Sequence, residues 1–164
     1  MAEKKQDAPK KTITTNRKAL HNYFVDEDHE AGVVLLGTEV KSLRDNKVQL
    51  MDAYARFQDN ELWLINAHIS PYSHGTHENH EPDRPRKLLM KRRELNRLRN
   101  KVETAGFTLI PLEMYFSGSN VKVRIGLCRG KKLFDKRETI RKREVAREIA
   151  RKTQDARRTS SPQK

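Results

Sequence analysis

The chain has 164 residues, which suits one domain with an extension, and it carries a formal net charge of +13. Because the net charge is strongly positive, an anionic polymer or surface is the expected partner. Hydrophobic and charged residues each make up 35% of the chain, which is enough apolar material for one modest core. The chain has no run of about 18 apolar residues, the length of a membrane span, no apolar signal-peptide core, and one cysteine, Cys128. These features exclude membrane-spanning and disulfide-stabilised proteins and predict a cytoplasmic protein with no membrane partner.

The N-terminal third of the chain predicts short strands and one short helix. Residues 1–12 are rich in Lys, Ala and Pro and are expected to be disordered. In residues 21–37, two apolar runs flank the acidic stretch 26–30, which predicts a strand, a turn or short helix, and a second strand. Thr38 is the expected N-cap of the helix that follows.

The middle of the chain predicts a β-hairpin and then a long loop. Residues 48–57 and 62–69 are rich in β-branched, aromatic and aliphatic residues, and Asp59 and Asn60 separate them as a turn signal. Residues 68–86 contain three prolines and four of the six histidines, which is typical of a loop.

The last elements of the folded part are one helix and two strands. Residues 91–105 have apolar positions at helical spacing, and Gly106 ends the helix. Residues 107–116 and 121–128 predict strands, with Pro111 marking an edge or a bulge. The fold class is therefore mainly β with helices. We expect a small OB-like Greek-key β-barrel of about six strands over residues 13–129, with two or three peripheral helices.

The positive charge is concentrated in two segments of the chain. Residues 84–101 carry a net charge of +8 and residues 129–164 a net charge of +9, so the remainder is slightly acidic. Residues 130–164 form a basic C-terminal tail whose apolar line, chiefly Val145 and Ile149, is too thin to stabilise a helix alone. We expect the tail to be disordered when free and helical when bound to an anionic partner.

Several short motifs occur in the order found in one bacterial family. They are Asn16-Arg17-Lys18-Ala19, Glu30-Ala31-Gly32, the stretch 37–44, Arg86-Lys87-Leu88-Leu89, and Gly130-Lys131-Lys132 followed by Asp135-Lys136-Arg137. Together they resemble the SsrA-binding protein family, small protein B (SmpB). The resemblance implies an OB barrel that binds the tRNA-like domain of transfer-messenger RNA and delivers it to stalled ribosomes for trans-translation. It also implies that the tail enters the empty message channel near the decoding centre and becomes helical there.

The resemblance also implies site residues. Those matching positions that the family uses against transfer-messenger RNA are Asn16, Glu30 and Leu89. Neighbouring cations are expected to contact its phosphates, namely Arg17, Lys18, Arg86, Lys87 and Lys91. Those matching the part of the tail directed at the small-subunit ribosomal RNA are Gly130, Lys131, Lys132, Asp135, Lys136 and Arg137, with Phe134 as a possible stacking ring.

Several of these residues have plainer interpretations that remain open at this stage. Asn16 either contacts a base edge or caps a turn, and the turn is the more common role. Glu30 either accepts a hydrogen bond from a base edge, orients a neighbouring cation, or is an ordinary surface acid. Leu89 contacts RNA or belongs to the core. Trp63 and the other strand aromatics, Tyr54, Phe57 and Phe107, are stacking platforms or core residues, and we favour the core.

Two other functions compete with the RNA adaptor. A metal-dependent nuclease would use the histidine-rich loop with His68, His74, His77 and His80, but the loop has no cysteine and no evident scaffold for a metal shell. A basic ribosomal structural protein is the other alternative. We expect a monomer that has no catalytic activity, no metal and no cofactor, and Cys128 is expected to be buried.

Overall fold

The computed structural model describes residues 9–75 and 78–159, which belong to two compact units, Met1–Gly130 and Lys131–Lys164. In chain order the first unit contains β1 (Lys10–Thr15), α1 (Arg17–Asn22), β2 (Tyr23–Val33), α2 (Gly37–Arg44), β3 (Val48–Gln49), β4 (Tyr54–Gln58), β5 (Glu61–Ile65), β6 (His68–Ile69), β7 (Arg86–Leu89), α3 (Arg92–Ala105), β8 (Thr108–Ser117) and β9 (Asn120–Gly130). The second contains α4 (Leu133–Thr159).

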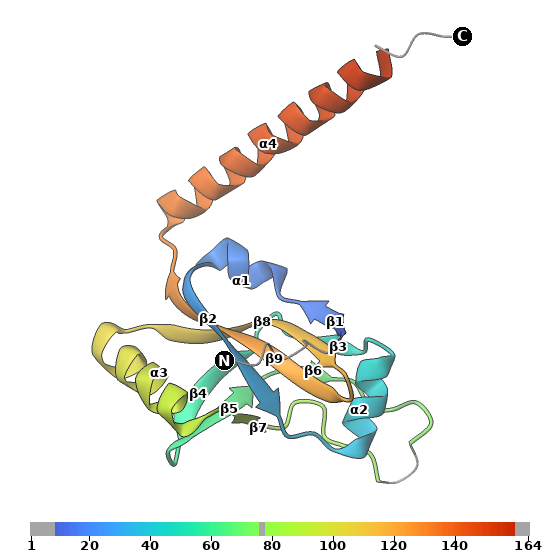
Figure 1. The fold of residues 1–164 in the computed structure, drawn as a ribbon, viewed down its shortest axis with the longest axis vertical. Coiled ribbons are helices and arrows are strands. Elements are labelled where there is room, and N and C mark those ends of the chain that lie inside the picture. Colours follow the sequence, from blue (N-terminus) through green and yellow to red (C-terminus); the bar gives the residue numbers. More distant parts are fainter. Residues whose placement is uncertain (1–8, 76–77, 160–164) are drawn as a thin grey trace, which may run out of the picture. The chain divides into compact units, whose positions relative to one another are not determined.

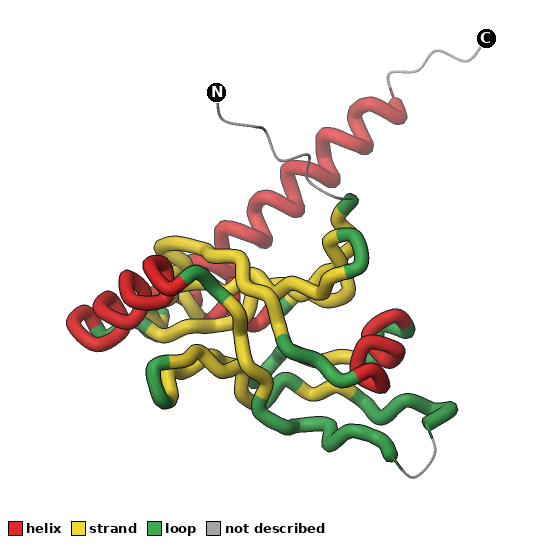
Figure 2. Tube along the Cα trace, turned by 60° about the horizontal axis from the view of Figure 1, so that its bottom comes forward, coloured by secondary structure: helices red, strands yellow, loops and turns green. Residues whose placement is uncertain are grey.

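The main sheet of the first unit closes on itself (Figure 1). Its strand order is β1-β8-β4-β5-β7-β2-β9, and β8 also pairs with β9, so six antiparallel strands form a ring. β1 extends the sheet beyond β8, and β3 and β6 make a separate two-stranded pair. Helices α2 and α3 lie on opposite sides of the ring (Figure 2). This architecture confirms the predicted fold class, mainly β with peripheral helices around a small closed β structure.

The hydrophobic core fills the inside of the ring because inward and outward residues alternate along each strand. Leu62 and Leu64 of β5 are fully buried, as are Val123 and Ile125 of β9. Burying each such side chain stabilises the fold by about 2 kcal/mol. β9 also requires Gly126, because a Cβ atom there would lie 2.9 Å from the Leu112 side chain.

Helix α3 forms as the sequence predicts. Leu95 and Leu98 are buried at helical spacing and belong to the core cluster. The helix ends at Gly106, whose φ of 65° is left-handed and favours glycine. The predicted hairpin turn is also confirmed, since Asp59 and Asn60 have φ values of 50° and 63° between the paired strands β4 and β5.

The acidic stretch near the N-terminus is not a turn, which corrects the sequence prediction. β2 runs without interruption from Tyr23 to Val33. Its acids are accommodated because cations on neighbouring elements meet them. Arg129 approaches Asp26 at 3.1 Å, and Lys101 of α3 donates a hydrogen bond to Glu27. A run of like charges is stable in a strand when cross-strand partners of the opposite sign are present.

Other boundaries differ from the sequence prediction by a few residues. β1 begins at Lys10, within the segment expected to be disordered, because it pairs with β8; residues 1–8 lie outside the described part. The bulge expected at Pro111 is present, as the β8–β9 register shifts between Pro111 and Glu113. Helix α2 begins at Gly37 rather than after Thr38, because the Glu39 carboxylate accepts a hydrogen bond from the Leu36 N–H at 2.7 Å.

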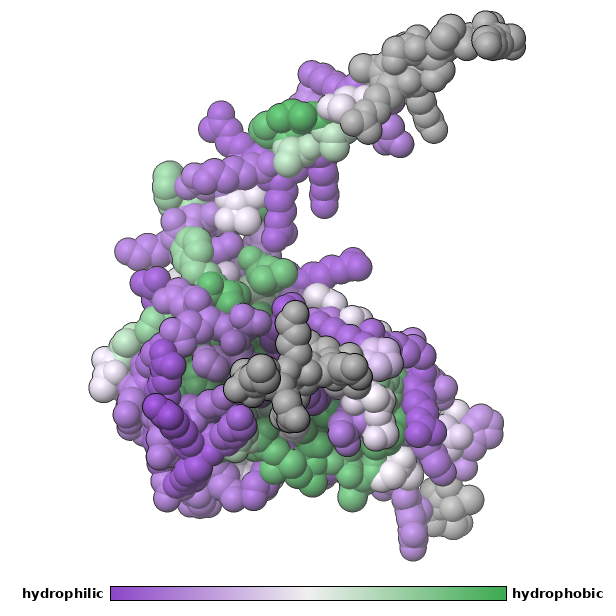
Figure 3. Space-filling model, viewed as in Figure 1, coloured by the Kyte–Doolittle hydropathy of each residue, from purple (hydrophilic) through white to green (hydrophobic). Residues whose placement is uncertain are grey.

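In the described part of the second unit, one long basic helix, α4, follows two residues of connection. Over its described surface, α4 is mostly hydrophilic with separate hydrophobic patches (Figure 3). Val145 and Ile149 of α4 are at least half exposed. Within α4, Glu148 and Lys152, four residues apart, form an ion pair with a separation of 2.9 Å. Disorder of the free tail and folding on binding stay predictions. None of the helices within the described residues is long and apolar enough to cross a membrane.

Candidate nucleic-acid interface

A polar cluster occupies the outer face of the ring where β2, β9 and β8 run side by side. Glu30 of β2 accepts hydrogen bonds from the Lys122 ammonium group of β9 and from the Tyr115 hydroxyl of β8. Lys122 and Tyr115 are register partners across β8 and β9. We call Glu30, Lys122 and Tyr115 the Glu30 cluster.

The electrostatics of the Glu30 cluster keep Glu30 and Tyr115 in fixed protonation states. Hydrogen bonds from Lys122 and then Tyr115 hold the pKa of Glu30 below 4.5. Burial, followed by the bond to Glu30, raises the pKa of the Tyr115 hydroxyl. Glu30 is therefore ionised and Tyr115 protonated throughout the physiological range. The carboxylate fixes where Lys122 and Tyr115 point, so the sequence hypothesis that Glu30 orients a cation is the one that this geometry supports.

A second set of charges surrounds the Glu30 cluster. The Lys10 ammonium group lies 4.2 Å from the centre of the Tyr115 ring and 2.9 Å from the Glu113 carboxylate. Arg124 approaches the same carboxylate at 3.2 Å. Burial opposes ionisation of Glu113, but the hydrogen bonds from Lys10 and Thr12 outweigh it and lower its pKa. The face is thus a near-neutral network of oriented donors.

The structure brings Leu89 and Glu30 to the same part of the ring. Gly32, two residues after Glu30, is the register partner of Leu89 on one side and of Lys122 on the other. Leu89 is half exposed, which excludes the core interpretation and leaves an apolar side chain facing solvent beside the Glu30 cluster. Lys87 lies on the same face of β7, and its ammonium group contacts the Glu61 carboxylate at 2.5 Å.

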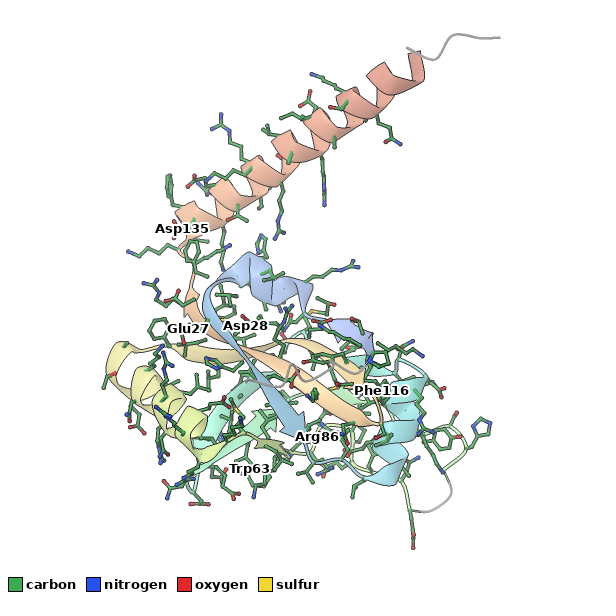
Figure 4. All side chains as sticks on the ribbon, in the orientation of Figure 1. Glu27, Asp28, Trp63, Arg86, Phe116 and Asp135 are labelled. Carbon is green, nitrogen blue, oxygen red and sulfur yellow. The ribbon has the colours of Figure 1, made fainter. Side chains whose placement is uncertain are left out.

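Arg86 does not face solvent, which corrects its assignment as a phosphate contact. Its side chain is fully buried and donates to the Glu39 carboxylate at 2.8 Å and to the carbonyl oxygens of Ala67, Arg84 and Pro82. Strand alternation causes this, because Arg86 points inward when Lys87 points outward. Figure 4 labels Arg86 within the ring unit. Its role is structural, joining β7 to α2 and to the long loop.

Asn16 is also buried, and the structure supports the cap interpretation. Its side-chain oxygen accepts from the Ala19 N–H at 3.1 Å, which caps α1, and its amide nitrogen donates to the carbonyl oxygens of Leu50 and Pro111. Arg17 and Lys18 follow on the exposed side of α1, and Lys18 contacts Asp52 at 2.8 Å. Asn16 therefore positions α1, and the two cations remain candidates for phosphate contact.

The first basic segment offers less free charge than its sequence indicates. Besides Arg84 and Arg86, which both contact Glu39, several cations are engaged by partners on the ring, namely Lys87 with Glu61, Arg92 with the Asn60 carbonyl and Lys101 with Glu27. Lys91, Arg93 and Arg97 are exposed at the start of α3 and along it. Together with Arg92, which is also exposed, and the partly exposed Lys87, they form the accessible cationic part of the segment.

The predicted ribosome-directed residues lie at the junction of the two units and in the first turns of α4. The backbone N–H of Lys132 donates to the Asp135 carboxylate at 3.2 Å, so Asp135, labelled in Figure 4, satisfies a free donor at the helix start. Leu133 and Phe134 are about three-quarters exposed. Lys131 contacts the Thr139 hydroxyl at 3.3 Å, and the remaining predicted positions are Lys136 and the exposed Arg137.

Gly130 ends β9 without any steric need for glycine. Its φ is not left-handed, and a Cβ atom added there would meet no atom within 4 Å among the described residues. The fold of the ring therefore does not explain why glycine occupies this position.

Lys122, Tyr115 and Lys10 are site residues that the sequence reasoning missed. They come from three strands that are distant in sequence, and only the β1–β8–β9–β2 register places them together. The alternation of residues 121–125 shows that Lys122 faces outward, but no local pattern identifies Glu30 as its partner.

His68 and His80 of the long loop make separate structural contacts. The ring nitrogens of His80 lie 2.9 Å from the Thr38 hydroxyl and 3.0 Å from the Ile69 carbonyl oxygen, while His68 contacts Asp83. Across the described residues, His, Cys, Asp and Glu side chains do not gather in any group of three that suits a metal ion, and His77 lies outside that part of the chain. Cys128 is fully buried, and burial and then Asp26 raise its pKa to about 11.

The fold and this face define a class of protein, a small basic β-ring protein whose outer face presents oriented hydrogen-bond donors. A family model described as "SmpB protein" matches residues 13–155. The chain is 57% identical over 143 residues to the SsrA-binding protein of Desulforudis audaxviator, covering 87% of this chain and 94% of that protein. It is 50% identical over 146 residues to the SsrA-binding protein of Treponema denticola, covering 89% and 95%.

A solved structure supports the same assignment. It is described as "tmRNA-SmpB: a journey to the center of the bacterial ribosome", and one of its chains is 50% identical with a TM-score of 0.62, covering 73% of this chain and 85% of that chain. The chain therefore belongs to the SmpB protein family.

Proposed function

We propose that this protein binds transfer-messenger RNA through the outer face of its ring and delivers it to stalled ribosomes for trans-translation. The names of its relatives, SsrA-binding proteins, and the neighbouring tmRNA–SmpB structure support this function. The proposal assigns the protein to the cytoplasm, where its RNA and ribosomes are found, and gives it no catalytic step.

The observation that carries the proposal is the Glu30 cluster beside Leu89. Glu30 holds the Lys122 ammonium group in place, which leaves further N–H donors for a phosphate oxygen. Leu89 supplies an apolar surface for a base or a ribose, as unstacked RNA loops allow. One carboxylate on an RNA-binding face is then consistent with binding, because it positions donors instead of meeting phosphate itself.

The two units divide the work in this proposal. The ring binds transfer-messenger RNA, and α4 enters the vacant message channel of the small subunit, near the decoding centre. A helix of 27 residues is about 40 Å long. The tail residues Lys131, Lys132, Phe134, Lys136 and Arg137 are the proposed ribosome contacts, and Asp135 starts the helix that presents them.

The test is the affinity for transfer-messenger RNA of Glu30→Gln and Lys122→Ala at physiological salt. Because each change removes a charge-assisted hydrogen bond, we expect a loss of about ten- to hundredfold in affinity. Lys142→Ala is the matched control, since Lys142 forms a comparable pair with Glu138 in α4. Unchanged affinity in both ring variants would exclude this face as the binding site.

Specificity is tested separately with an unstructured RNA of equal length. If the protein binds transfer-messenger RNA specifically, its affinity for that RNA should be about a thousandfold higher than its affinity for the unstructured RNA. Equal binding that disappears as the salt concentration rises would mean that charge alone drives association, and it would contradict the proposed function.

A further inference from the structure

Trp63, the only tryptophan of the chain, lies on the outer face of the ring. On β5 its neighbours Leu62 and Leu64 are fully buried, so strand alternation directs Trp63 away from the core, and its side chain remains partly exposed. Figure 4 shows it at the lower edge of the ring, near β5 and β7. This position differs from the core location that we favoured from the sequence.

Cations flank Trp63 on both adjacent strands. Its register partners are Arg56 of β4, which is exposed, and Lys87 of β7. Glu61 contacts the Lys87 ammonium group and fixes it over this part of the face. An aromatic ring between two cationic side chains is the arrangement with which proteins bind a base and its phosphates.

Exposed apolar side chains continue the same face beyond Lys87. The Val34 N–H donates to the Lys87 carbonyl at 3.0 Å, which places Val34 beside β7, and Val34 is 44% exposed. Leu89, two residues after Lys87, is 50% exposed. We call Arg56, Trp63, Lys87 and Val34 the Trp63 row. Leu89 connects it to the Glu30 cluster, because Gly32 lies between Leu89 and Lys122.

We propose that Trp63 is a stacking platform for an unpaired base of the same RNA that the Glu30 cluster binds, with Arg56 and Lys87 contacting the flanking phosphates. This inference rests on the proposed function and deepens it. The continuity of the Trp63 row with the Glu30 cluster argues for a single RNA ligand across both. Arg56 and Lys87 argue for a nucleic acid, since a protein partner would not need a positive charge on each side of the Trp63 indole.

The experiment uses the tryptophan fluorescence of the full-length protein, excited selectively over its tyrosines, so that the emission comes from Trp63. Transfer-messenger RNA is added to saturation, and binding is measured independently by filter retention. We expect the RNA to quench the tryptophan emission and to protect the indole from acrylamide, because a stacked base covers its face. Saturated binding with unchanged emission and unchanged acrylamide access would overturn the inference and leave the proposed function standing.

Variants test whether the indole side chain of Trp63 contributes to affinity for transfer-messenger RNA. Trp63→Leu is expected to lose about ten- to hundredfold in affinity, the range seen when a stacking residue is removed, whereas Trp63→Phe should retain most of it. Tyr72→Leu is the matched control, because Tyr72 is an aromatic residue near a cation, with Lys41 5.4 Å from its ring centre, but lies on the long loop. Equal losses for the Leu and Phe variants would contradict stacking.

Two readouts keep the outcomes separable. If Trp63→Leu is poorly folded by circular dichroism, the fluorescence of the wild-type protein still decides the question. If the wild-type protein fails to retain transfer-messenger RNA on the filter, both the inference and the proposed function are wrong.

Discussion

The two basic segments of this chain have almost the same net charge and different structures. In residues 84–101, two arginines are used against the buried Glu39, and several other cations pair with groups on the ring. In residues 129–164, the cations of the described part extend along a helix in which two acids, Glu138 and Glu148, pair with lysines of the same helix. The cations of the first segment are therefore largely used in contacts that stabilise the ring, whereas those of the second segment remain available to a partner.

The comparison shows that net charge in a sequence does not measure accessible charge. A guanidinium group that is fully hydrogen-bonded inside a protein contributes to stability and contributes nothing to phosphate binding. Arg86 and Lys87 are neighbours in sequence, and only Lys87 is on the outer face. The same segment thus mixes structural and binding cations, which mutation can separate.

Removal of everything after Gly130 should have the largest effect on function. The ring is a separate compact unit, so we expect the truncated protein to lose less than about tenfold in affinity for transfer-messenger RNA, through reduced general charge attraction. Its activity in a trans-translation assay should be abolished. Alanine replacement of Asp135, Lys136 and Arg137 should give a milder version. Loss of RNA affinity and ribosomal activity together would contradict the division between the two segments.

Arg86→Met should cause the largest loss of stability among single substitutions in the first segment. It leaves a buried Glu39 carboxylate without one of its two arginines, and breaking a buried pair costs about 3–5 kcal/mol. Lys87→Met, the adjacent control, breaks a partly exposed pair and should cost less than about 1 kcal/mol. Urea denaturation measures both. Similar midpoints for the two variants would show that the Arg86 pair does not stabilise the ring.

The same buried group predicts how stability depends on pH. Burial opposes ionisation of Glu39, but hydrogen bonds from Arg84, the Leu36 N–H and Arg86 outweigh it, and the pKa falls below 4.5. A carboxyl whose pKa is lowered by folding stabilises the protein above pH 4.5, and this stabilisation is lost as the pH falls through the lower folded pKa. Glu39→Gln should therefore be less stable than the wild type at pH 7, and the difference should shrink below pH 4.5. A constant difference in denaturation midpoint across this range would exclude Glu39 as the titrating group.

The smallest expected effect comes from the exposed cations of α3. Replacing Arg93 and Arg97 with Gln should leave stability within about 0.5 kcal/mol. If both contact phosphate, the slope of log affinity against log salt concentration should fall by about 2. Arg99→Gln is the control, because Arg99 already pairs with Glu103 at 3.1 Å. An unchanged slope in the double variant would place α3 outside the RNA interface.

Local features of the sequence predicted much of the fold. The helix ended by Gly106, the hairpin at Asp59 and Asn60, and the bulge at Pro111 all depend on backbone preferences that act within a few residues. The acidic part of β2 was predicted wrongly because a charge run is compatible with a strand only when partners on other elements neutralise it.

The sequence by itself determined the family, the mainly β fold, the two basic segments and the position of Glu30 and Leu89 in the motifs. Only the tertiary structure decided which side chains are available to RNA. Asn16 and Arg86 are buried, while Lys122 and Trp63 are partly exposed on the outer face of the ring. The physical reason is that hydrogen-bond register across the strands closes the ring, and this register joins residues that are up to about a hundred positions apart in the chain.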